Sequence, residues 1–209
     1  LYLRALAIRE KVLGSEHPDT AAALDDLGLI HIAQGQYEQA ELFHRRALAI
    51  REKVLHPEHP SIADNLNNLA LVYRNQNKYE QAEPLYQQAL AIYEKALGPM
   101  HPYTAITLDN LALVYVAQGR YTEAEPLHKR ALTIFEQAAG PEHPDTAIAL
   151  ANLAHLYHLQ RQYEQAESLY LRALTIGEQA MGPEHPRVIT FLINPVSYTH
   201  LTLPTIFRV

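Results

Sequence analysis

The sequence of 209 residues contains no cysteine and no apolar run long enough to cross a bilayer. Without cysteine the chain can form no disulfide, no thiolate zinc site and no cysteine nucleophile, which excludes a secreted disulfide scaffold. The N-terminus also lacks the basic and apolar segments of a signal peptide. We therefore expect a soluble protein of a reducing compartment, the cytoplasm, without a membrane as partner.

Basic residues are in the minority, with 17 Lys and Arg against 23 Asp and Glu and a formal net charge of -6. A protein that binds a phosphate backbone needs a basic face to displace counterions. This composition argues against nucleic acid as a partner.

Glycines are few, and all of the eight except Gly177 fall on hinge, turn or close-packing positions. None remains to build a phosphate-cradling loop, and there is no Gly-x-Ser-x-Gly elbow. The acidic residues recur in "YEQAE" segments, which are more simply a solvated helix flank than a paired-carboxylate site. We expect no catalytic residue, no cofactor and no enzyme activity.

A 42-residue repeat is the dominant pattern. The pair His-Pro recurs at this interval, as His17-Pro18, His59-Pro60, His101-Pro102, His143-Pro144 and His185-Pro186. This grid predicts four complete units, 14–55, 56–97, 98–139 and 140–181. Residues 1–13 are expected to be the second helix of a cut repeat, and residues 182–194 the start of another.

Each unit reads as two amphipathic helices, here called helix A and helix B. In the second unit, Pro60 suits the first position of helix A, and apolar residues then recur at helical spacing. A short turn ends helix A, where a glycine in other units suits a left-handed helix end. Helix B is expected from Tyr79 to about Leu97.

The apolar positions that carry the pattern are Leu66, Leu69, Ala70, Tyr73, Tyr79, Ala82, Tyr86 and Ala89. They resemble the tetratricopeptide repeat, whose usual period is 34 residues. The longer unit, with "ALAIREKVLG" running into "EHPDTAAALDDLGLIHIAQGQYEQAE", is similar to the repeats of kinesin light chains. The resemblance implies an all-α fold, a right-handed α-solenoid of antiparallel helix pairs, and a role in holding other proteins.

Histidines number twelve, but their spacing does not favour a metal site. Those of the His-Pro pairs lie one helical hairpin apart and are expected to cap helix A. His155 and His158 can share one helix face, yet two ligands without a third make a weak site. We expect no metal, and interpret these two residues as groove-lining side chains.

The face of helix A opposite its apolar stripe is expected to line the concave surface of the solenoid, where a peptide would bind. The candidate groove residues are Asp26, Asp64, Asn67, Asn68, Leu71, Arg74, Asn75, Asp109, Asn110, Leu113, Asn152 and His155. The kinesin light chain resemblance implies that Asn68, Asn110 and Asn152 hold a peptide backbone. Alternatively, these asparagines stabilise contacts between neighbouring helices.

The groove is expected to be acidic, because Asp25, Asp26, Asp64 and Asp109 outnumber Arg74. This favours a neutral or basic extended ligand with apolar anchors and micromolar affinity. The leading hypothesis is thus a protein-interaction scaffold. The alternative is a regulatory or sensor arm of a larger nucleotide-binding or enzymatic protein.

Two expectations concern the ends of the sequence. Leu1, Leu3, Leu6 and Ile8 leave an apolar helix without its partner, so self-association through uncapped ends is predicted. Residues 195–209 break the repeat, and the back-translation of Val196 to Thr205 matches an adapter used in sequencing libraries. We interpret this tail as foreign to the native protein.

Overall fold

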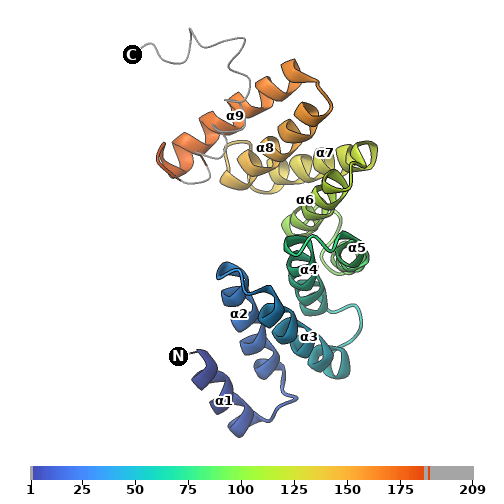
Figure 1. The fold of residues 1–209 in the computed structure, drawn as a ribbon, viewed down its shortest axis with the longest axis vertical. Helices are drawn as coiled ribbons and strands as arrows, with labels where there is room; N and C mark the ends of the chain where they lie inside the picture. Colours follow the sequence, from blue (N-terminus) through green and yellow to red (C-terminus); the bar gives the residue numbers. More distant parts are fainter. Residues whose placement is uncertain (1, 186–187, 189–209) are drawn as a thin grey trace. The chain divides into compact units, whose positions relative to one another are not determined.

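The computed structural model describes residues 2–185 and residue 188 (Figure 1). Within that part, the chain forms helices and no strand. The helices are α1 (Tyr2–Leu13), α2 (Pro18–Ala33), α3 (Tyr37–Val54), α4 (Pro60–Asn75), α5 (Tyr79–Ala96), α6 (Pro102–Ala117), α7 (Tyr121–Ala138), α8 (Pro144–Leu159) and α9 (Tyr163–Met181). The predicted all-α class is confirmed. The tail 195–209 interpreted as foreign lies outside the described residues.

The His-Pro pairs start the A-type helices α2, α4, α6 and α8 as predicted. Each helix has proline in its first turn, where a missing amide hydrogen costs nothing. The preceding histidine caps the helix, because its Nδ1 accepts a hydrogen bond from the backbone N–H of the residue two positions later. For His59 and Ser61 the distance between these nitrogens is 3.1 Å. The fifth pair includes Pro186, which is not among the described residues.

A residue with left-handed backbone lies two positions after the last residue of each A-type helix. Gly35 (φ 72°) and Gly119 (φ 76°) fill this position in the first and third repeats, as the sequence suggested. The second and fourth repeats place Asn77 (φ 59°) and Arg161 (φ 62°) there instead. The turn therefore requires a positive φ rather than glycine itself. At Asn77, the side-chain oxygen also accepts a 2.7 Å hydrogen bond from the Tyr79 hydroxyl.

Two compact units make up the chain, residues 1–118 with α1 to α6 and residues 119–209 with α7 to α9. In the first unit each helix packs against the next, and the A-type helices α2, α4 and α6 also touch in sequence. In the second unit α8 packs against both α7 and α9. This consecutive packing confirms the architecture of stacked helix pairs. None of the helices in residues 2–185 is long and apolar enough to span a membrane.

Alanine dominates the contacts between paired helices. The helices that correspond to helix B, here called B-type, are α1, α3, α5, α7 and α9. Ala47 on α3, Ala89 on α5, and Ala63 and Ala70 on α4 are all completely buried. A methyl side chain allows two helix backbones to approach closely while still removing apolar surface from water. The close packing fixes which face of each A-type helix remains at the surface.

Candidate functional site

Helix α4 presents one partly exposed stripe along its length. Its members are Asp64, Asn67, Asn68, Leu71, Arg74 and Asn75, the six residues predicted from the sequence for this helix. They recur at intervals of three and four residues and so share one helix face. The opposite face is buried, with Leu66, Leu69 and Tyr73 each at most 5% exposed.

The neighbouring helices of the first unit extend this stripe. Asp26 on α2 is exposed, and Asn110 and Leu113 on α6 are partly exposed. Since α2 and α6 both pack against α4, the three helices together present what we call the A-helix face. In the second unit, Asn152 and His155 are partly exposed on α8.

The asparagines of the A-helix face differ in their bonding. Arg74 on α4 donates from Nη1 to Oδ1 of Asn110 on α6 at 2.8 Å, so Asn110 contributes to the packing of adjacent repeats. The Asn67 side-chain oxygen lies 3.3 Å from the Thr107 hydroxyl, also across this junction. In contrast, Asn68 has no side-chain hydrogen bond within residues 2–185. Its amide can both donate to and accept from a ligand.

Two aspartates expected in the groove are buried. Asp25 is 7% exposed and Asp109 is 8% exposed, so neither adds appreciable negative surface. The expectation of four groove carboxylates was wrong for these two, because both are buried and Asp25 is bonded to residues of α3 and α4. Asp26 and Asp64 remain. Asp64 accepts a 2.5 Å hydrogen bond from the Tyr93 hydroxyl, and burial together with this carboxylate raises the pKa of Tyr93.

A buried polar cluster around Asp25 was missed by sequence reasoning. Asp25 accepts from His44 Nδ1 at 2.9 Å, and it also accepts from Arg51 and Asn65. Arg51 bonds Asn65 and the Ser61 carbonyl as well, so one cluster joins α2, α3 and α4. The signal was present but weak: Arg51 occupies a position where the next two repeats have the aromatic residues Tyr93 and Phe135.

A second recurrent contact joins α3 to α4, α5 to α6 and α7 to α8. The Tyr73 hydroxyl donates to Glu41 at 3.0 Å, and the Tyr115 hydroxyl donates to Glu83 at 3.1 Å. In the second unit, Tyr157 donates to Glu125 at 3.3 Å. The last glutamate of each "YEQAE"-type segment is therefore a packing residue in these three repeats, where the sequence suggested only a solvated flank.

His155 occupies a position where the first three repeats have leucine. Its ring lies 6.3 Å from that of His158, which is 5.8 Å from the ring of Tyr163. Burial lowers the pKa of both histidines, and the nearby His158 and His128 lower that of His155 further. Across the described part of the chain, no group of three His, Cys, Asp or Glu side chains could hold a metal ion.

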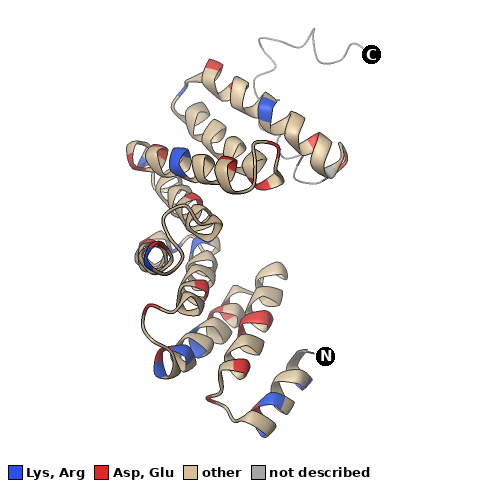
Figure 2. Cartoon of the chain, turned by 180° about the vertical axis from the view of Figure 1, so that it is seen from behind, with Lys and Arg blue, Asp and Glu red and all other residues tan. Residues whose placement is uncertain are grey.

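Charged residues concentrate on the B-type helices (Figure 2). Helix α3 carries Arg45, Arg46 and Arg51 together with several glutamates, whereas Asp109 is the one charged residue of α6. The A-helix face carries few charges, Asp26 and Asp64 against Arg74, and otherwise offers amide and aliphatic groups.

A tetratricopeptide repeat family model matches residues 1–53, 61–137, 107–179 and 145–194. A search of curated proteins finds no match.

Several solved structures are similar to this chain. The nearly identical TPR-like repeats of a Podosopora anserina protein described as a kinesin light chain share 30% identity and a TM-score of 0.71, covering 85% of this chain and 84% of that one. BtubC (BKLC) from P. vanneervenii shares 28% identity and a TM-score of 0.74, covering 88% and 73%. The apo form of RapI, at 18% identity and a TM-score of 0.75 over 95% and 52%, shows likeness of fold alone.

The family model covers most of the chain, and its matches follow the helix pairs described above. The kinesin light chain resemblance of the long repeats agrees with the structural neighbours. The chain belongs to the tetratricopeptide repeat family.

Proposed function

We propose that this protein is an interaction scaffold that binds an extended peptide segment along its A-helix face. Tetratricopeptide repeats generally act as non-catalytic scaffolds for protein interactions. Stacked helical repeats commonly bind their partners on an extended surface of this kind.

The observation that carries the proposal is the pairing of Asn68 with Leu71 in the middle of the face. Asn68 has an amide without an internal hydrogen bond in the described chain, and Leu71 is a partly exposed aliphatic side chain one turn later. The amide can bond a peptide backbone in both directions, while the leucine provides an apolar contact. Leu29, 44% exposed on α2, and Leu113 on α6 add further apolar surface on both sides.

The expected affinity is micromolar. Each hydrogen bond contributes a net of about 0.5 to 1.5 kcal/mol, whereas association costs on the order of 4 to 15 kcal/mol. A few amide contacts cannot meet this cost alone, so apolar side chains of the ligand must supply the remainder. The ligand should therefore carry apolar anchors spaced along an extended chain.

The charge of the face favours a neutral or basic ligand. Asp26 is exposed, and Asp64 is partly exposed, against the single cation Arg74. Arg74 already donates to Asn110, which limits its use for an acidic ligand. A ligand rich in carboxylates would meet net repulsion here.

A peptide array incubated with the full chain tests this proposal. We expect binding to neutral and basic peptides with apolar anchors, and Asn68→Ala should weaken it about tenfold, because a lost backbone contact costs near 1.4 kcal/mol. Gln39→Ala, an exposed change on α3, is the matched control and should bind normally. Preference for acidic or C-terminal carboxylate peptides, or equal binding by Asn68→Ala, would contradict the proposal.

A further inference from the structure

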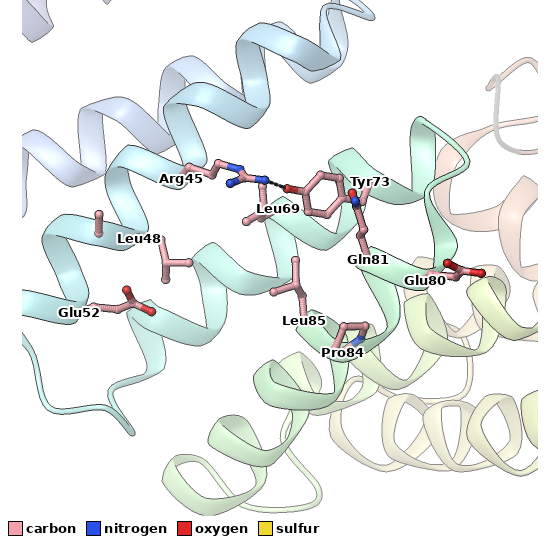
Figure 3. Close-up of a pocket in the computed structure, with 10 residues that line it drawn as sticks. Arg45, Leu48, Glu52, Leu69, Tyr73, Glu80, Gln81, Pro84 and Leu85 are labelled. Atoms are coloured by element: carbon pink, nitrogen blue, oxygen red, sulfur yellow. Dashed lines mark hydrogen bonds between the residues drawn. The ribbon is translucent and has the colours of Figure 1, made fainter.

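A cavity of about 600 Å³ lies between α3, α4 and α5 in the first unit, on the opposite side of α4 from its polar stripe. Figure 3 shows that α3 contributes Arg45, Leu48 and Glu52, α4 contributes Leu69 and Tyr73, and α5 contributes Glu80, Gln81, Pro84 and Leu85. Leu48 and Leu85 are only partly buried, so the cavity offers them to a ligand. It is an apolar pocket with charged groups around it.

The one arginine of this pocket is already engaged. Arg45 donates to the Tyr73 hydroxyl at 2.5 Å and pairs with Glu41 at 3.0 Å. Glu52 and Glu80 have no partner within residues 2–185. Arg45 and Glu52 are seven residues apart on α3, which separates them by roughly 10 Å along the helix axis. The Glu52 end of the pocket therefore has an unbalanced negative charge.

The reason for this imbalance is a break in a repeated ion pair between B-type helices. Glu10 on α1 pairs with Arg46 on α3 at 2.5 Å, and Glu136 on α7 pairs with Arg172 on α9 at 2.7 Å. Both pairs join residues 36 positions apart. Glu52 occupies the same repeat position as Glu10 and Glu136, but the residue 36 positions later is Gln88. Glu52 thus lacks the cation that its counterparts have.

We propose that this pocket binds a basic side chain, lysine or arginine, from a partner protein. The aliphatic stem would pack on Leu48 and Leu85, and the cation would pair with Glu52 in place of the missing arginine. Long basic side chains commonly bury their stem on apolar surface while the charged end meets a carboxylate. This surface is separate from the A-helix face, so the inference does not depend on the peptide-binding proposal.

The test is an NMR titration of the full chain with isotope-labelled methyl groups, using blocked amino acids as probes. N-acetyl-lysine methylamide and N-acetyl-arginine methylamide are compared with the uncharged N-acetyl-norleucine methylamide. We expect saturable shifts at Leu48 and Leu85 for at least one basic probe, with binding at least about threefold tighter than for norleucine. Equal binding by norleucine, or no shift with either basic probe, would overturn the proposal.

Two variants test the role of Glu52. Glu52→Gln removes the charge, and Gln88→Arg restores the internal ion pair, so each should reduce binding of the basic probe to the level of norleucine. Glu136→Gln is the matched control, because that glutamate is already paired with Arg172 and its loss should leave the titration unchanged. Retained binding in both Glu52→Gln and Gln88→Arg, with folded spectra, would refute the assignment.

Discussion

At the scale of single residues, the contact between Gly28 and His44 leaves no room for another atom. A Cβ atom added at Gly28 would lie 2.4 Å from His44 Nε2, and the His44 side chain is completely buried. Gly28→Ala should therefore destabilise the first unit by about 1 to 3 kcal/mol, the usual cost of overpacking. Urea denaturation followed by circular dichroism measures this change.

The Gly28 prediction has an internal control. In a His44→Ala background the obstructing ring is gone, so adding Gly28→Ala should cost little further stability. A double-mutant cycle would then show strong coupling between the two positions. Independent, additive effects would mean that the ring is not the obstacle.

A second residue-scale prediction concerns the pH dependence of the second unit. The pKa of His155 is lowered in the folded chain, mainly by burial and then by His158 and His128. The folded state therefore favours neutral His155. The unfolded chain protonates this histidine near its ordinary pKa of about 6.5, so the second unit loses stability as the pH falls from there through the lower pKa of the folded state. Leucine is the residue at this position in the first three repeats. In His155→Leu the melting temperature should therefore decrease less between about pH 7 and pH 5.

The comparison for this experiment is His143→Asn, which replaces a capping histidine with another good cap and leaves His155 in place. That variant should keep most of the acid sensitivity. If His155→Leu retains the full loss of stability on acidification, the buried histidine is not its source.

Residue-scale features were the least predictable from the sequence. Aligning the repeats shows the residues that they share and draws attention away from residues that occur in one repeat alone. Asp25 and Asp26 were both expected in the groove, yet a one-residue step on a helix turns a side chain by about 100°. Arg51 and Asn65, which bond Asp25, lie 26 and 40 residues away in sequence.

At the scale of helices and their junctions, the Asp25 cluster connects three elements. Asp25→Ala would leave Arg51 buried without its carboxylate, since only 11% of that side chain is exposed. Breaking a buried ion pair on one side costs about 3 to 5 kcal/mol. We expect a loss of this size in the unfolding free energy from urea denaturation.

The control at this scale is an exposed ion pair. Lys53 pairs with Glu16 at 2.5 Å, with side chains 64% and 57% exposed. Lys53→Ala should cost less than about 1 kcal/mol, because water screens such pairs. Similar losses for Asp25→Ala and Lys53→Ala would show that the buried cluster has no special stabilising role.

The helices themselves were predicted well, for reasons of local chemistry. Proline at the start and the left-handed turn at the end act within a few residues, so they can be read from sequence. The predicted end of helix B in the second unit, about Leu97, is within one residue of Ala96, the observed end of α5. The hydrogen bond between Arg74 and Asn110 could not be predicted from such local signals, because these two residues lie on helices of different repeats.

At the scale of the whole molecule, α1 exposes apolar side chains, and for Ile8 the equivalent residue on α3 is buried. Ile8 is 54% exposed and Val12 is 72% exposed, whereas Ile50, the equivalent of Ile8 on α3, is only 2% exposed. We expect concentration-dependent self-association, measurable by sedimentation velocity or light scattering. Ile8→Lys should weaken it.

The matched change is Leu42→Lys, at an exposed apolar residue on α3 that is 61% exposed. It should leave the association unchanged if α1 is the contact. A chain that stays monomeric at high concentration would disprove this prediction.

The buried Asp25 cluster also has a consequence for how the chain finds its correct pairing. Nearly identical repeats can exchange partners during folding, with a helix packing one repeat too far along. If α3 packed 42 residues too far along, Arg51 would meet Asn67 instead of Asp25. It would also meet Thr107 instead of Asn65. The buried guanidinium would then have no carboxylate, at a cost of about 3 to 5 kcal/mol. One irregular junction thus marks the register for a sequence that otherwise repeats itself.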